Sequence, residues 1–144
     1  ERWGDAADAY VSASERMEPT PELMSNLMNM LVRQKRYREV VNIADTIQKF
    51  RDDANALERK GWALFRLGEY DASDRAYRAA VAIDPQEWQA FNGIGVTALN
   101  RWLLSDRTDT ESWNEAQASF RASLRINRDQ DKVVRLMLDY GMSR

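Results

Sequence analysis

One sequence pattern returns four times along the 144-residue chain, and it constrains the fold more than any other feature. The four segments begin with an aromatic residue at positions 3, 37, 70 and 113, so the spacings between them are 34, 33 and 43 residues. Small or hydrophobic residues follow at offsets of three, seven and ten in each segment, and these offsets lie on one face of an α-helix. A period of this length predicts a stack of similar units, each packed only on its neighbours.

A second helical segment precedes each of the last three aromatic segments, beginning at Pro21, Ala54 and Trp88. Small or apolar residues recur every three or four positions in these segments, and no stretch alternates between apolar and polar residues as a strand would. Polar residues followed by proline, or by Glu or Gln three positions later, indicate helix starts. We expect such starts at Thr20–Pro21, Asp84–Pro85, Thr108–Glu111 and Asn127–Gln130.

The period, the paired helices and the proline at the junction together resemble the tetratricopeptide repeat (TPR) family. The best-matching stretch carries the family pattern at Gly61, Leu64, Gly68, Tyr70, Tyr77, Ala80 and Pro85. It departs from the pattern at Lys60, where the family usually has Leu, and at Ser73, where it usually has Ala. The resemblance implies an all-α fold, a right-handed superhelical solenoid of antiparallel helix pairs.

The repeats divide the chain into one repeat domain spanning residues 1–144. The expected units are a half-repeat holding only a second helix (1–20), repeats at 21–53, 54–87 and 88–130, and a capping helix at 131–144. The third full repeat has an insertion near 102–112. Because the first unit lacks its first helix, we expect the chain to be a fragment of a longer array, and the exposed half-repeat to be a possible site of self-association.

The composition argues against catalysis and metal binding. The chain has no histidine and no cysteine, which removes the commonest general base, the cysteine nucleophile and the usual nitrogen and sulfur metal ligands. The sequence predicts no enzyme, no catalytic residue, no metal and no cofactor. A net charge of −2 argues against a nucleic-acid partner. No apolar run approaches the ~20 residues of a membrane span, and nothing distinguishes a cytoplasmic from a periplasmic location.

The resemblance also implies where a partner binds, because first helices of successive TPR pairs line a concave groove that takes extended peptides or helices. The positions on that side of the helices include Ser25, Val32, Glu58, Leu99 and Asn100. The candidate site residues among them are Asn29, Arg33, Arg59, Trp62, Phe65, Arg66, Asn92, Val96 and Arg135. Trp62 and Phe65 stand out because exposed aromatic residues beside arginine are typical of binding hot spots. The alternative is that these two rings fill space against neighbouring helices.

The insertion offers a second candidate surface. Trp102 and Leu103 continue the apolar face of the preceding helix, so that helix is expected to run one or two turns beyond its usual end. Trp102 is then either part of a docking surface with Leu103 or packed against Trp113 inside the lengthened pair, and the sequence favours the packing.

The predicted function is therefore a non-enzymatic protein–protein interaction module or scaffold that binds a peptide or helix in its groove. Some TPR domains grip an acidic C-terminus with a clamp of Lys, Asn and Arg, but Ser25 and Gly93 stand where this clamp has Lys and Arg, so we do not expect it here. The alternatives are a structural spacer or self-association unit in a larger repeat protein, and a regulatory domain attached to an enzyme. Fold alone does not decide among them.

Overall fold

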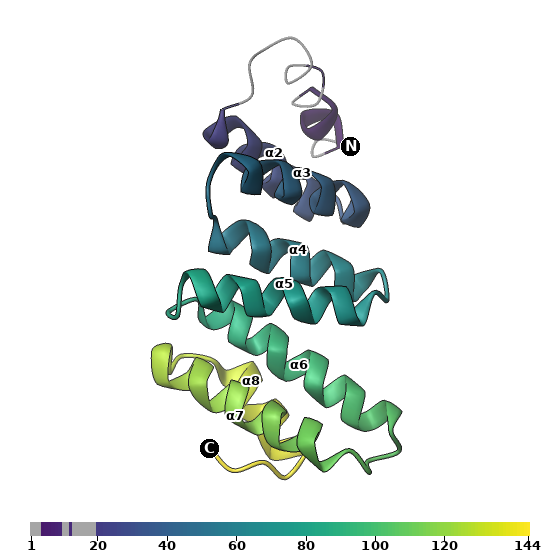
Figure 1. Cartoon of the computed structure of the whole chain (residues 1–144), viewed down its shortest axis with the longest axis vertical. Helices are drawn as coiled ribbons and strands as arrows, with labels where there is room; N and C mark the ends of the chain where they lie inside the picture. The colour runs from purple at the N-terminus through teal and green to yellow at the C-terminus, as the bar shows by residue number, and fades with distance from the viewer. Residues whose placement is uncertain (1–3, 10–11, 13–19) are drawn as a thin grey trace.

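A computed structural model describes residues 4–9, 12 and 20–144, and this part of the chain contains helices and no strand. Residues 4–9 are helical. The helices that follow are α2 (Pro21–Arg33), α3 (Tyr37–Phe50), α4 (Ala54–Arg66), α5 (Tyr70–Ile83), α6 (Trp88–Leu104), α7 (Thr110–Ile126) and α8 (Asp131–Asp139). Figure 1 shows α2 to α7 stacked one after another across the long axis of the molecule, with α8 beside α7 at the C-terminal end.

Each helix packs on the next one along the chain, as expected for helix pairs joined by short loops. The first helices of successive pairs also touch one another, α2 with α4 and α4 with α6. The three first helices, α2, α4 and α6, therefore lie next to one another along the stack. The arrangement is an all-α solenoid of antiparallel helix pairs.

The helix starts agree only partly with the expected signals. Thr20 caps α2, since its hydroxyl accepts a hydrogen bond from the Leu23 backbone N–H at 3.1 Å. The prediction for Pro85 was wrong, because α6 begins three residues later at Trp88 and Pro85 lies in the turn before it. The Asp84 side chain stabilises that turn, accepting from the Gln86 N–H at 2.9 Å.

The two expected capping boxes near the C-terminus are absent. Asp109, and not Thr108, caps α7, and its carboxylate accepts from both the N–H and the hydroxyl of Ser112 at 3.1 and 2.6 Å. Gln130 precedes α8 without capping it through its side chain. Its amide group instead donates to the buried Ser123 hydroxyl at 2.9 Å. In both cases a nearer or better-placed partner competes with the expected one, which sequence spacing does not reveal.

Glycine allows the helices of the central repeats to approach closely. The ring of Tyr77 on α5, which is 6% exposed, lies between Gly61 on α4 and Gly93 on α6. A Cβ atom at Gly61 would lie 2.8 Å from this ring, and one at Gly93 would lie 2.3 Å from it. Both positions therefore require a residue without a side chain, and Tyr77 occupies the space that results.

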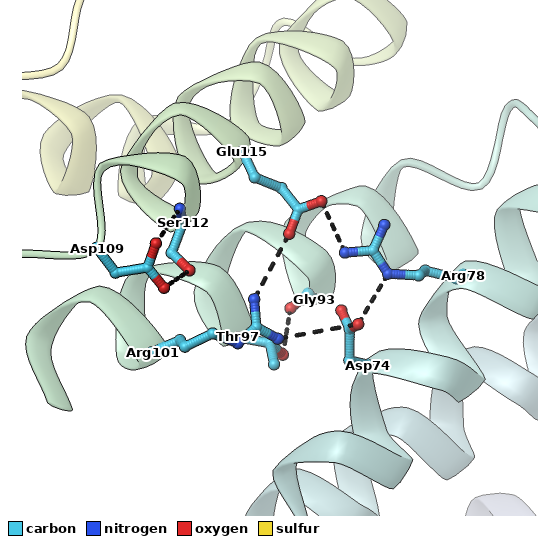
Figure 2. A network of polar contacts seen from close by, with 8 residues as sticks. All are labelled: Asp74, Arg78, Gly93, Thr97, Arg101, Asp109, Ser112 and Glu115. Atoms are coloured by element: carbon cyan, nitrogen blue, oxygen red, sulfur yellow. Dashed lines mark hydrogen bonds and ion pairs between the residues drawn. The ribbon is translucent and has the colours of Figure 1, made fainter. Parts of the chain in front are cut away.

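A charged network joins three helices of the C-terminal half (Figure 2). Arg78 on α5 donates to Asp74 one turn before it at 2.8 Å and to Glu115 on α7 at 2.7 Å. Arg101 on α6 lies 3.9 Å from Asp74 and 3.6 Å from Glu115. The side chains are partly exposed, so the network contributes more to the alignment of the helices than to their stability.

The half-repeat expected at residues 1–20 and its exposed face at Trp3 lie largely outside the described residues. In the part that the structure describes, Ala7 is fully buried in the same core as Met28 of α2. Among the described residues no helix is both long and apolar enough to cross a membrane.

A candidate peptide-binding groove

A groove of about 420 Å³ opens between α4 and α6, with Tyr77 of α5 at its base. Gly93 lines the groove, and a Cβ atom at this position would lie 2.3 Å from the Tyr77 ring. The groove volume lies within the range of small-molecule and side-chain pockets. The residues that line it are Glu58, Trp62, Phe65, Arg66, Tyr77, Gln89, Asn92, Gly93 and Val96.

The α4 side of the groove is aromatic. Trp62 and Phe65 lie almost one helical turn apart on α4, and both are half-buried. The Trp62 ring meets the ring of Tyr37 edge-on at 5.2 Å, and Phe65 contacts Tyr70 at 5.1 Å. Neighbouring helices thus hold both rings in place while leaving part of each facing the groove.

Arg66 completes this wall at the C-terminal end of α4. Its guanidinium group lies 5.3 Å from the centre of the Tyr37 ring, a cation–π contact. Arg66 is itself exposed, so the positive charge remains accessible from the groove.

A buried carboxylate occupies the other end of the same wall. Glu58 is 7% exposed and makes no hydrogen bond within the described residues. The nearest cation is the Nη1 atom of Arg59, 3.7 Å from the Glu58 carboxylate oxygen. Burial raises the pKa of Glu58 to about 7, because removal from water disfavours the charged form; Arg59 opposes this shift and Glu87 adds to it.

The α6 side of the groove is polar at Asn92. Its amide nitrogen donates to the Gln130 side-chain oxygen at 2.7 Å, which fixes the orientation of the amide. The Asn92 side-chain oxygen is buried and has no hydrogen-bond partner among the described residues. The groove thus holds two oxygen acceptors, from Glu58 and Asn92, that no donor of the described chain satisfies.

The structure brings five of the predicted site residues together in this groove: Trp62, Phe65, Arg66, Asn92 and Val96. The other four do not line it: Asn29 and Arg33 lie exposed on α2, Arg59 is half-buried on α4, and Arg135 lies exposed on α8. The two aromatic rings pack against neighbouring helices, as the packing alternative expects. They also line the groove, and their role in binding stays a prediction.

Sequence reasoning placed Glu58 among the groove positions, but it did not single out Tyr77 or Gln89 as site residues. Glu58 precedes Trp62 by four residues and Phe65 by seven, so helical spacing alone places it on the same face. The sequence spacing does not predict that Glu58 is buried, because burial depends on how the helices pack.

At the insertion, α6 continues to Leu104 as the apolar spacing predicts. Trp102 packs against Trp113 with ring centres 4.5 Å apart and against Tyr140 at 6.3 Å. Leu103 is half-buried against the same core, while Leu104 is 72% exposed. The packing alternative for Trp102 is therefore the one that the structure shows, and a docking role for Trp102 and Leu103 stays a prediction.

Known proteins resemble the chain mainly in fold. A family profile for the tetratricopeptide repeat matches residues 54–87, which form α4, α5 and the loop before α6. Among curated proteins, a sequence comparison finds no match. Among solved structures, YrrB, described as "a TPR protein with an unusual peptide-binding site", is 18% identical, with a TM-score of 0.75 over 94% of this chain and 66% of YrrB.

Two structures of MamA are similar to a comparable degree. A double mutant, "MamA RS-1 ArsTM", is 17% identical, with a TM-score of 0.71 over 91% of this chain and 69% of that one. The form "MamA 41-end" from Desulfovibrio magneticus RS-1 gives the same identity and TM-score, covering 91% and 70%. The chain thus spans about two thirds of the length of these structures. The likeness confirms the predicted all-α, right-handed superhelical solenoid. A tetratricopeptide repeat is therefore matched at residues 54–87, and the fold of the chain is that of solved tetratricopeptide repeat proteins.

Proposed function

We propose that this chain is a non-catalytic interaction module whose α4–α6 groove binds a short peptide or one face of a helix from a partner protein. The observation that carries the proposal is the composition of the groove wall. Two aromatic rings held by neighbouring helices, Trp62 and Phe65, lie beside Arg66 over a hollow of about 420 Å³. Preorganised aromatic residues with an adjacent arginine are typical of binding hot spots, because little side-chain entropy is lost when a partner covers them.

The family supports a binding function of this kind, since tetratricopeptide repeats typically mediate protein–protein interactions. YrrB, which shares the fold at low identity, is described as having a peptide-binding site. That description belongs to YrrB, and it adds to the proposal only that this architecture can accommodate a peptide.

The proposal can be tested without knowing the natural partner. Random twelve-residue peptides displayed on phage are selected on the purified chain, and the affinity of the selected peptides is measured by fluorescence anisotropy. We expect Trp62→Ala or Phe65→Ala to weaken binding at least about tenfold, as truncation of a hot-spot aromatic does.

Phe50→Ala is the matched control. Phe50 is 55% exposed at the end of α3 and does not line the groove, so this variant removes an aromatic side chain of the same kind elsewhere on the surface. Selected peptides that bind both groove variants as tightly as the unmodified chain would show that the groove is not the binding site.

A further inference from the structure

Glu58 is an unusual residue to find in the wall of an aromatic groove. Its side chain is 9% exposed, and buried carboxylates in folded proteins are normally held by hydrogen bonds. Among the described residues its one oppositely charged partner is Arg59, with 3.7 Å between the closest nitrogen and oxygen, too far for a hydrogen bond. The Nε atom of Arg59 is itself buried without a partner. The two side chains therefore do not satisfy each other.

The other charged or titratable groups near Glu58 are not hydrogen-bonded to it among the described residues. Glu87, before α6, is an acid whose charge opposes ionisation of Glu58. Tyr77 on α5 interacts with the carboxylate only through its charge, and no hydrogen bond joins the two side chains. The Glu58 carboxylate is therefore free to accept hydrogen bonds from a ligand in the groove.

Asn92, across the groove, also has an oxygen acceptor without a hydrogen-bond partner among the described residues. Gln130 holds its amide nitrogen, and Gln130 is in turn fixed by the Ser123 hydroxyl, so the amide cannot rotate freely to satisfy its own oxygen. The two acceptors lie in the wall of one hollow. A ligand group with several N–H donors and a positive charge would fit this chemistry, and such groups are the ammonium of lysine and the guanidinium of arginine.

The rest of the wall agrees with a cationic ligand group at this end. Trp62 follows Glu58 by one turn of α4, and an indole ring is the aromatic surface that attracts cations most strongly. Arg66, the cation of the groove, lies eight residues from Glu58, which is about 12 Å along a helix, and its charge rests over Tyr37. The groove is thus acidic at one end and basic at the other.

We propose that the groove takes a peptide whose lysine or arginine side chain passes over Trp62 and ends at Glu58 and Asn92. This inference rests on the proposed function, because it names the chemistry of the peptide that occupies the same groove. It also assigns a direction to that peptide, with its basic residue at the Glu58 end and any acidic residue at the Arg66 end.

The test uses the phage-selected peptides and the variant Glu58→Gln, which keeps the size of the side chain and removes its charge. Glu22→Gln on α2 is the matched control, since Glu22 is exposed and lies outside the groove. Circular dichroism verifies that each variant is folded. We expect the selected peptides to share a Lys or Arg, and Glu58→Gln to weaken them about tenfold or more while Glu22→Gln changes nothing.

A matching change in the peptide tests its basic residue, whether lysine or arginine, and completes a double-mutant cycle with Glu58→Gln. Lys is replaced by norleucine, or Arg by citrulline, and each peptide is measured with the unmodified chain and with Glu58→Gln. The inference predicts that the loss from the peptide change disappears in the variant, because both changes remove the same interaction.

The outcomes separate this inference from the proposed function. Peptides that need Trp62 but bind Glu58→Gln as tightly as the unmodified chain would overturn the cation site and leave the groove intact. Peptides that bind independently of Trp62 would refute the groove and the inference together.

Discussion

Replacing Gly93 by alanine tests whether the close packing of α5 between α4 and α6 is as tight as the structure indicates. The added Cβ would lie 2.3 Å from two ring carbons of Tyr77, closer than nonbonded carbon atoms approach in proteins. The ring cannot move far toward α4, because it already packs closely on Gly61. A Cβ atom at Gly61 would lie only 2.8 Å from the ring. The helices must therefore separate, or Tyr77 must leave its position.

The magnitude follows from two opposing effects. Overpacking a core costs about 1–3 kcal/mol, and the blocked ring favours the upper part of that range. Alanine stabilises the helix by about 1 kcal/mol relative to glycine, which offsets part of the cost. We expect a net loss of about 2 kcal/mol in the free energy of unfolding, which corresponds to about 4–8 °C in Tm for a chain of this size.

The assay is urea and thermal unfolding followed by circular dichroism at 222 nm, with Tyr77→Ala as the second arm of a double-mutant cycle. Once the ring is removed, Gly93→Ala has nothing to collide with, so it should stabilise the Tyr77→Ala chain by about 1 kcal/mol. A stabilising effect of Gly93→Ala in the unmodified chain, or equal effects in the two backgrounds, would refute the packing argument.

Three further predictions concern charge and the insertion. Glu58→Gln should raise the free energy of unfolding at pH 8 by at most about 3 kcal/mol and leave it unchanged at pH 4. The pKa of this carboxyl is 4.5 in the unfolded chain and about 7 in the folded one, so the unmodified chain loses stability as pH rises through that interval. A pH series of urea midpoints measures the difference. Glu115→Gln, which removes the α7 partner of Arg78, should cost less than about 1 kcal/mol in low salt and nothing measurable in 1 M NaCl, as denaturation at the two ionic strengths would show. Trp102→Ala should cost about 3 kcal/mol in thermal unfolding because it removes the ring packed on Trp113, whereas a loss below about 1 kcal/mol would indicate a free surface residue.

The repeat period was sufficient to predict the fold class. Aromatic residues 33 or 34 positions apart, followed by small residues on one helical face, require helix pairs that stack, and this pattern is local enough to read from a single sequence. The starts of α3, α4, α5 and α6 at Tyr37, Ala54, Tyr70 and Trp88 follow the same pattern. Local pattern failed where several partners compete, as at Thr108, where Asp109 caps the helix instead.

The sequence predicted where the groove lies, but not the buried carboxylate and the unpaired amide oxygen within it. Helical spacing placed Trp62 and Phe65 on one face of α4, and both line the groove. The charge interactions of Glu58 involve Tyr77 of α5 and Glu87 of the loop before α6, so no local pattern contains its environment. The unpaired oxygen of Asn92 likewise depends on Gln130, which lies 38 residues further along the chain.

The buried carboxylate has opposite consequences for folding and for binding. In the free chain, ionised Glu58 lowers stability because it is buried and no residue of the described part of the chain donates a hydrogen bond to it. In the proposed complex, the peptide's cation supplies that hydrogen bond and lowers the pKa of Glu58. Binding should therefore strengthen as pH rises from 6 to 8, the direction opposite to the change in stability of the free chain.

The most direct test of the central claim is the response of the tryptophan indole N–H signals to a selected peptide. The chain has five tryptophans, and among those that the structure describes Trp62 lies in the groove while Trp102 and Trp113 pack against each other near α8. In a two-dimensional ¹H–¹⁵N NMR titration, we predict that the Trp62 signal shifts with peptide concentration and that the signals of Trp102 and Trp113 stay in place. A titration that moves the Trp102 and Trp113 signals and leaves Trp62 unchanged would contradict the account.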